Sequence, residues 1–85
     1  MTPQEAIASG EFTASEIAVI KWQYNLYGSF YTSLFEAFGH ADRENIERLQ
    51  KGFPDEVIGF RTWRGDFGSS LGDELASKID EAIGL

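Results

Sequence analysis

The sequence contains no cysteine and a single histidine, His40. Without cysteine the chain cannot form disulfide bonds, thiolate zinc sites or a cysteine nucleophile. Because small secreted domains usually need disulfides for stability, this absence favours a reducing compartment, and we expect a cytoplasmic protein. His40 follows an apolar helical pattern, and a protonated imidazole is favoured at a helix C-terminus. We therefore interpret His40 as structural and predict no metal site.

Long apolar runs and basic residues are also scarce. No stretch approaches the roughly 18 apolar residues of a membrane span, and Thr2–Glu5 lacks the basic and apolar segments of a signal peptide. The chain contains fourteen acidic and seven basic residues, which gives a net charge of −7. That charge opposes non-specific binding to nucleic acid and to anionic membranes. We expect no membrane association and consider nucleic acid a disfavoured partner.

No motif for catalysis or cofactor binding is present. The acids occur as adjacent pairs, such as Asp55 with Glu56, and neighbours on a helix point about 100° apart, so such a pair is not a catalytic dyad. The glycines of Gly65–Gly68 do not follow a strand and precede no Lys-Ser/Thr pair, which excludes a phosphate-binding loop. We predict a protein that is not an enzyme and that binds no cofactor.

The composition nevertheless predicts a folded chain. It is 42% hydrophobic and 14% aromatic, which is too apolar for a disordered tail. Its 85 residues correspond to one domain with a thin core. We therefore expect a single domain over residues 1–85, stabilised by efficient packing or by a second chain.

Local signals mark where helices begin. Three capping boxes, in which a hydroxyl residue is followed three positions later by an acid, predict helix starts after Thr2, Thr13 and Ser70. In the last of these helices, apolar residues recur at every fourth position, which predicts a buried face. These residues are Leu71, Leu75, Ile79 and Ile83.

Two further helices are expected in the middle of the chain. Asp42 can cap a helix that Gly52 ends, and Pro54 suits the first turn of another that stops at Gly65. No segment shows the period-two alternation of a strand. The sequence therefore predicts a compact all-α domain of five helices.

The most informative element is one long helix predicted over about 15–38, at the centre of the domain. Apolar residues recur there at steps of three and four. They are Ile17, Ile20, Tyr24, Tyr27, Tyr31, Leu34 and Phe38.

A second apolar set lies on the adjoining third of the circumference of this predicted helix. It comprises Val19, Trp22, Leu26, Phe30 and Ala37. A surface helix needs only about a 100° apolar stripe. Two sets of partners must therefore cover this helix, and a second copy of the protein could supply one of them.

The three tyrosines of the long helix allow several interpretations. They can be core residues whose hydroxyls reach solvent or a carbonyl, part of a self-association or partner-binding surface, where Tyr and Trp are enriched, or a stacking platform for a base. The candidate interaction surface drawn from the sequence comprises Trp22, Tyr24, Tyr27, Phe30, Tyr31, Arg61, Trp63 and Arg64.

The last three of these candidates lie on the helix that starts at Pro54. Together with the helix before it, that helix could imitate a helix-turn-helix. Its N-terminal part carries Asp55 and Glu56, however, which DNA phosphates would repel. Trp and Arg are also typical of protein-binding hot spots. Alternatively, Trp63 fills the core and the arginines are solvated.

The stretch from Trp22 to Trp63 begins Trp-Gln-Tyr-Asn-Leu-Tyr-Gly-Ser-Phe-Tyr and includes Gly-Phe-Pro-Asp-Glu-Val. It resembles small uncharacterised proteins encoded by phages and prophages of gut bacteria. The resemblance contains no functional motif. It implies an accessory protein that acts by binding, for example to a host enzyme or defence complex.

These observations lead to one main functional hypothesis and one alternative. The main hypothesis is a non-enzymatic protein–protein interaction module that self-associates as a homodimer or higher homo-oligomer, in the role of a phage-encoded inhibitor of a host factor. The alternative is a small nucleic-acid or nucleotide-binding protein that uses Arg61, Trp63 and Arg64.

Overall fold

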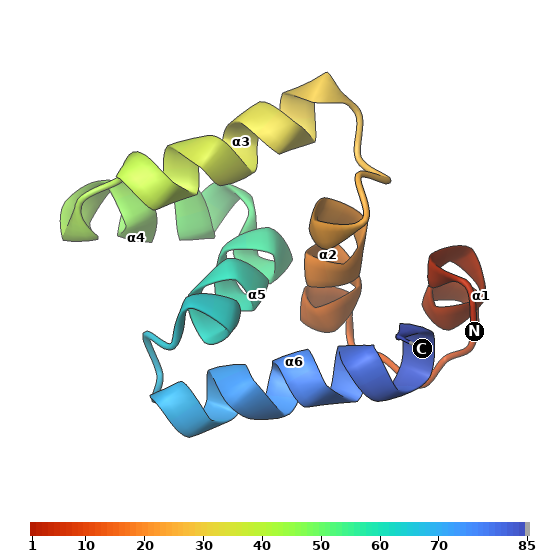
Figure 1. Cartoon of the computed structure of the whole chain (residues 1–85). Coiled ribbons are helices and arrows are strands. Elements are labelled where there is room, and N and C mark those ends of the chain that lie inside the picture. Colours follow the sequence, from red (N-terminus) through yellow and green to blue (C-terminus); the bar gives the residue numbers. More distant parts are fainter. Residues whose placement is uncertain (85) are drawn as a thin grey trace.

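The computed structural model describes residues 1–84, and this part of the chain forms six helices and no strand (Figure 1). The helices are α1 (Pro3–Ala8), α2 (Ala14–Gln23), α3 (Ser29–His40), α4 (Arg43–Gly52), α5 (Pro54–Arg64) and α6 (Ser69–Ile83). The predicted all-α class is confirmed. The predicted arrangement of five helices around one long helix is wrong in its details. The final residue of the predicted domain, residue 85, lies outside the described residues.

The long helix predicted over 15–38 is broken into α2 and α3. Its interruption is a Schellman motif, the hydrogen-bonded turn that commonly ends helices. Asn25 adopts a left-handed φ of 54°, and its N–H donates to the Trp22 carbonyl at 3.3 Å. The Leu26 N–H donates to the Lys21 carbonyl at 2.8 Å. Asn is among the few non-glycine residues that tolerate this backbone region, so the sequence permits the turn.

The second half of the interrupted helix begins after Gly28, which is the N-cap of α3. Glycine is an accepted N-cap, although no side chain satisfies the first N–H groups here. After the turn, α3 runs across the top of the molecule while α2 lies between α1 and α5 (Figure 1). The apolar residues before the turn and those after it therefore pack mainly in different places, since Ile17, Val19 and Ile20 pack with α1 and α6 whereas Leu34 and Phe38 pack with α4 and α5.

The most extensive helix–helix packing is between α2 and α5. Gly59 makes this close approach possible, because a Cβ at that position would clash with the Ser15 carbonyl oxygen and lie 3.0 Å from the Val19 Cγ2. This pair forms the centre of the molecule, and the other helices pack around it.

Two apolar clusters form the core. The first joins α1, α2 and α6 through buried side chains, namely Ala6, Phe12, Val19, Ile20, Leu75 and Ile79. The second joins α2 to α3, α4 and α5, through Ala18, Phe35, Phe38, Ile46, Val57 and Phe60. Trp22 packs against both clusters. The burial predicted for Leu75 and Ile79 is confirmed, and Ile83 is half-buried.

The helix starts were predicted with mixed success. The capping boxes at Thr2 and Thr13 are confirmed, since each hydroxyl accepts from the third helical N–H and each partner glutamate accepts from the cap N–H. Asp42 also caps α4, and its Oδ1 accepts from the Asn45 N–H at 2.8 Å. The box predicted at Ser70 is wrong, because the N-cap of α6 is Gly68, two residues earlier, which has no side chain to accept a cap hydrogen bond.

The prediction that Leu71 is buried is also wrong, since its side chain is 46% exposed. The first turn of α6 approaches α5 through Gly72 instead. A Cβ on Gly72 would lie 3.0 Å from the Thr62 carbonyl oxygen. Adjacent residues on a helix point about 100° apart, so Gly72 rather than Leu71 faces α5 at this closest approach.

The two ends of the described chain lie side by side (Figure 1). The Met1 ammonium donates to the Ala82 carbonyl at 2.7 Å, which satisfies one of the free carbonyls at the end of α6. Across residues 1–84, no helix combines the length and the apolar character that crossing a membrane requires.

Candidate functional site

The eight side chains predicted as an interaction surface are found in three places. Tyr27, Phe30 and Tyr31 lie together with Phe53, and their rings are in contact. Tyr24 lies in the turn between α2 and α3. The other four, Trp22, Arg61, Trp63 and Arg64, lie around the contact of α2 with α5. The structure therefore does not form one continuous surface from these residues.

We call the group Tyr27, Phe30, Tyr31 and Phe53 the aromatic surface. The Tyr27 and Tyr31 rings stack with their centroids 4.6 Å apart, and the Phe30 ring meets Tyr31 edge-on at 5.2 Å. Phe53, at the junction of α4 and α5, lies 6.2 Å from Phe30 and 6.5 Å from Tyr31. Phe30 is 62% exposed, the most of any large apolar side chain in the described part of the chain. Its ring thus has neighbours on one side and solvent on the other.

Carboxylates and one lysine surround Tyr27 in the aromatic surface. Burial, together with the charges of Glu56 and Asp55 and the neighbouring Tyr31, raises the pKa of Tyr27 to about 12. The Lys21 Nζ lies 5.6 Å from the centroid of the Tyr27 ring, within the range of a cation–π contact. The Tyr27 hydroxyl is therefore a neutral group over the physiological pH range.

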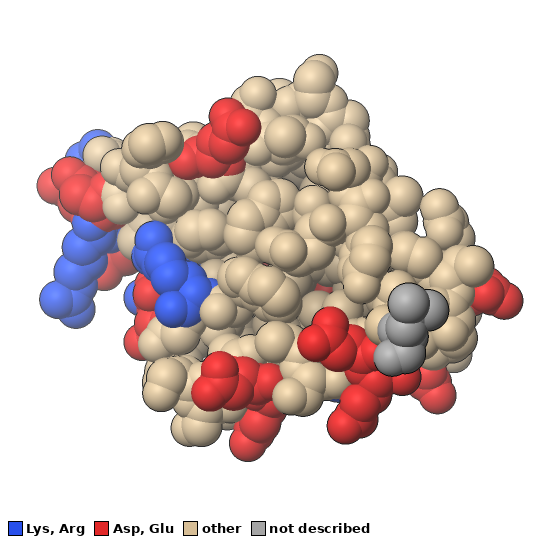
Figure 2. Space-filling view, viewed as in Figure 1, with Lys and Arg blue, Asp and Glu red and all other residues tan. Residues whose placement is uncertain are grey.

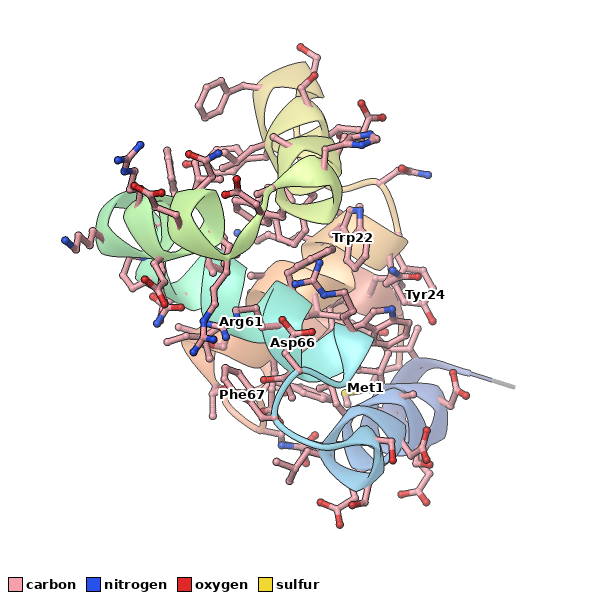
Figure 3. The ribbon with its side chains drawn as sticks, turned by 90° about the vertical axis from the view of Figure 1, so that its left-hand side faces the viewer. Met1, Trp22, Tyr24, Arg61, Asp66 and Phe67 are labelled. Atoms are coloured by element: carbon pink, nitrogen blue, oxygen red, sulfur yellow. The ribbon has the colours of Figure 1, made fainter. Side chains whose placement is uncertain are left out.

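The turn between α2 and α3 is a second apolar region at the surface. Tyr24 is 37% exposed and Leu26 is 36% exposed. Figure 3 shows Tyr24 at the edge of the molecule, beyond the end of α2. Together with Phe30, three of the described chain's exposed large apolar side chains fall within residues 24–30.

The two tryptophans take part in the core. The Trp22 ring stacks on Phe35 at 5.0 Å and lies 5.5 Å from Phe60, and Trp63 meets it edge-on at 6.4 Å. Both indoles are half-buried. The interpretation of Trp63 as a core residue therefore describes its position best, and the same is true of Trp22.

Both candidate arginines are held by one carboxylate, that of Asp66. Figure 3 shows Asp66 in the turn after α5, the helix that carries Arg61. Arg64 donates from Nε and Nη2 to the two carboxylate oxygens at 2.8 and 2.6 Å. Arg61 donates from Nε to Asp66 at 3.2 Å and from Nη1 to the Gln50 Oε1 at 3.0 Å. Its guanidinium also lies 4.9 Å from the centroid of the Phe67 ring.

This arrangement has an electrostatic consequence. The hydrogen bonds from Arg64 and Arg61 hold the pKa of Asp66 below its ordinary value despite partial burial, and Asp66 in turn raises the pKa of Arg64. A phosphate would have to compete with a carboxylate that already pairs bidentately with Arg64. Arg61 and Arg64 are thus already paired with Asp66, and Trp63 packs against Trp22.

A groove lies on another part of the molecule, between the first turn of α2, α5 and α6. Its volume is about 500 Å³, and Ile58, Leu71 and Leu75 provide its apolar lining. The ion pair between Lys78 Nζ and Glu16 Oε1, at 2.9 Å, lies at the groove. None of the predicted candidates lines it.

Charge is unevenly distributed over the molecule. Figure 2 shows acidic side chains along the edge formed by α6, whereas the middle and top of the same face, over α2 and α3, carry few charges. Within residues 1–84, no three His, Asp or Glu side chains gather closely enough to hold a metal ion. Apolar contact is therefore the chemistry that the surface over α2 and α3 offers.

No protein-family model matches the chain, and neither a curated protein nor a solved structure is significantly similar to it. The site must therefore be interpreted from its own geometry.

Three residues that shape these regions were not among the eight candidates drawn from the sequence. Phe53 belongs to the aromatic surface, Leu26 is exposed in the α2–α3 turn, and Asp66 binds both arginines. For Asp66 a local signal existed. It directly follows Gly65, which ends α5 in a left-handed conformation. The Asp66 N–H bonds back to the Arg61 carbonyl at 2.9 Å, which brings its side chain close to both arginines.

Proposed function

We propose that this protein is a non-enzymatic protein–protein interaction module that self-associates through the region around the α2–α3 turn. One observation carries the proposal, namely the concentration of exposed apolar side chains there. Tyr24 is 37% exposed, Leu26 36% and Phe30 62%. These three residues are close together along the chain, with Tyr24 and Leu26 in the turn and Phe30 in the first turn of α3. Several exposed apolar groups in one short segment are more typical of an interaction site than single ones, which are common on any surface.

The chemistry around the turn supports this choice of surface. Tyr and Phe supply large contact areas with few rotatable bonds, so ordering them on binding costs little entropy. On the face that Figure 2 shows, the surface over α2 and α3 carries few charges, so apolar contact over that face would meet little of the repulsion between two chains of charge −7. We expect the protein to act in the cytoplasm. The more specific role, a phage-encoded inhibitor of a host defence factor, rests on the sequence resemblance alone.

The nucleic-acid alternative has less support. It depends on Arg61 and Arg64, and the Asp66 carboxylate binds both of them. If the purified protein retained nucleic acid on a filter at low salt, that result would support the alternative. Because the chain is acidic overall and these arginines are occupied, we expect no retention.

The proposal is tested by light scattering over a wide range of concentrations. We expect the wild type to form dimers that Phe30→Ser weakens about tenfold or more, as loss of a central aromatic contact does. Leu71→Ser is the matched control, because Leu71 is also 46% exposed but lies on α6. A wild-type protein that stays monomeric at every concentration, or equal weakening by both variants, would contradict the proposal.

A further inference from the structure

The α2–α3 turn divides the chain into two halves that share both apolar clusters. The first half is residues 1–23 and the second is residues 29–84, and residues 24–28, which we call the hinge, connect them. In the first cluster, Val19 and Ile20 of the first half pack with Leu75 and Ile79 of the second. In the second cluster, Ala18 and Trp22 of the first half meet residues of α3, α4 and α5. Neither half has a complete core without the other.

Polar contacts also join the two halves. Lys78 donates to Glu16 at 2.9 Å, and the Met1 ammonium donates to the Ala82 carbonyl at 2.7 Å. Trp22 contacts three rings, all of which belong to the second half. Every one of these contacts could form equally well between the first half of one copy and the second half of another. Only contacts involving the hinge itself would change.

The hinge sequence is compatible with a continuous helix. It contains no proline, and the apolar stripe crosses it at steps of four, three and four through Ile20, Tyr24, Tyr27 and Tyr31. Asn25 leaves the helical region for a positive φ, which costs a non-glycine residue some stability. A Cβ at Gly28 would have nothing within 4 Å, so no packing contact requires glycine at this position.

Three of the exposed large apolar residues lie in or directly after the hinge, where a straightened hinge would form new contacts. When two copies exchange their first halves, the two straightened hinges pass beside each other and create an interface that the monomer lacks. Tyr24 and Leu26 belong to the hinge, and Phe30 follows it within the first turn of α3. Exchange would cover apolar surface that the monomer leaves in water.

We propose that the protein forms a domain-swapped homodimer, in which residues 24–28 straighten to join α2 and α3 and each copy's residues 1–23 pack against residues 29–84 of the other. This inference rests on the proposed self-association and adds its structural route. The partner is a second copy of the chain, because only this chain supplies the halves that complete each core.

The first test changes the preference of the hinge between a turn and a continuous helix. The dimer association constant is then measured by sedimentation. Gly28→Ala favours the continuous helix and removes a good N-cap from the turn, so we expect association to strengthen about tenfold or more. Asn25→Gly favours the left-handed turn and weakens the continuous helix, so we expect association to weaken by a similar factor. As a control, Gly39→Ala raises helix propensity inside α3, where a Cβ would also be unobstructed, and should leave association unchanged. An unchanged constant in both hinge variants would overturn the swap.

The second test uses the absence of native cysteine. In the double variant Glu16→Cys and Lys78→Cys, the two thiols replace an ion pair that joins the two halves. Because the ion pair joins the tips of two long side chains, the two cysteines are linked with a bismaleimide of matching span rather than by a direct disulfide. After isolation of dimer and monomer, each is treated with this linker and run on a denaturing gel. We expect the dimer to give covalent dimers, because the pair then spans two chains, and the monomer to give internally linked monomers.

The outcomes separate the swap from the proposed function. Dimers that give only internally linked monomers would show side-by-side association, which overturns the swap and leaves self-association standing. A protein that remains monomeric even as Gly28→Ala would overturn both. The single variants Glu16→Cys and Lys78→Cys give the background of random cross-linking.

Discussion

The Arg61–Arg64 region and the aromatic surface contain the same kinds of residues that interfaces favour, yet they differ in how those residues are used. In the first region, Asp66 pairs with both arginines and Trp63 packs against Trp22. In the second, the Phe30 ring is 62% exposed although its neighbours are ordered by ring contacts. Residue type alone therefore does not identify an interface. The partners already present within the chain decide which groups remain available.

The largest expected change in the free energy of unfolding comes from Trp63→Ala, in the Arg61–Arg64 region. Because Trp63 fills space beside Trp22 and the first apolar cluster, its removal should cost about 3 kcal/mol in the free energy of unfolding. Urea unfolding followed by circular dichroism measures the change. If Trp63 were instead a solvent-facing hot spot, the variant would keep nearly all of its stability and lose only binding.

A smaller effect is expected from Asp66→Asn, which removes the carboxylate that both arginines share. We expect a loss of about 1 kcal/mol near neutral pH, the upper end for a partly exposed ion-pair group. Folding lowers the Asp66 pKa, so the carboxylate stabilises the fold above its ordinary pKa of 3.8, and this stabilisation disappears as the pH falls through the lower folded-state value.

Urea titrations at both ends of that pH range measure the contribution of Asp66. The stability difference between wild type and Asp66→Asn should vanish in acid. Asp73→Asn, at an exposed position of α6, provides the control for loss of one negative charge. A difference that persisted unchanged at low pH would mean that the ion pairs do not contribute.

The environment of Tyr27 predicts a change in alkaline solution. Burial and the nearby carboxylates raise its pKa from 10.0 to about 12, so folding favours the neutral phenol. Its contribution to stability is complete below the ordinary value of 10.0 and is lost as the pH rises through the folded-state value. Because the side chain is only half-buried, we expect the decline to be about 1 kcal/mol or less.

The Tyr27→Phe variant tests this prediction because phenylalanine does not titrate. Comparing its stability with that of the wild type across the alkaline range isolates the contribution of the Tyr27 hydroxyl. Parallel declines in the two proteins would show that the aromatic surface does not shield this group.

The smallest effect on stability is expected from Phe30→Ala. The Phe30 ring is mostly in water already, so the free energy of unfolding should change by no more than about 0.5 kcal/mol. Urea unfolding at a concentration where the protein is monomeric checks this value. A loss as large as that expected for Trp63→Ala would place Phe30 in the core and remove the contrast between the two regions.

Sequence reasoning worked best where the decisive interactions are local. The caps at Thr2, Thr13 and Asp42 each join residues three apart, and α5 begins at Pro54 and ends before Gly65 as expected. Such hydrogen bonds depend on neighbouring residues only, so they can be predicted without knowing the fold. The predicted start of α6 was wrong by two residues, because Gly68 rather than Ser70 occupies its N-cap.

The candidate site was predicted less well because exposure is not a local property. Tyr27, Phe30 and Tyr31 come together as neighbours on the chain, but Phe53 joins them only through the packing of α3 with α5. The unbroken apolar stripe indicated one helix over 15–38. Asn25 and Gly28 each carry only a modest penalty in a helix interior, so the sequence pattern could not exclude continuity.

The sequence by itself determined that the chain is helical and where most helices begin, because capping and helical periodicity act over three or four residues. The tertiary structure decided that the predicted long helix divides at 24–28, that Trp22 and Trp63 pack into the core, and that Phe30 stays in solvent. The physical reason is that a turn with weak intrinsic preference follows whichever arrangement buries more apolar surface. Here the division lets α2 pack against both clusters while α3 packs against the second.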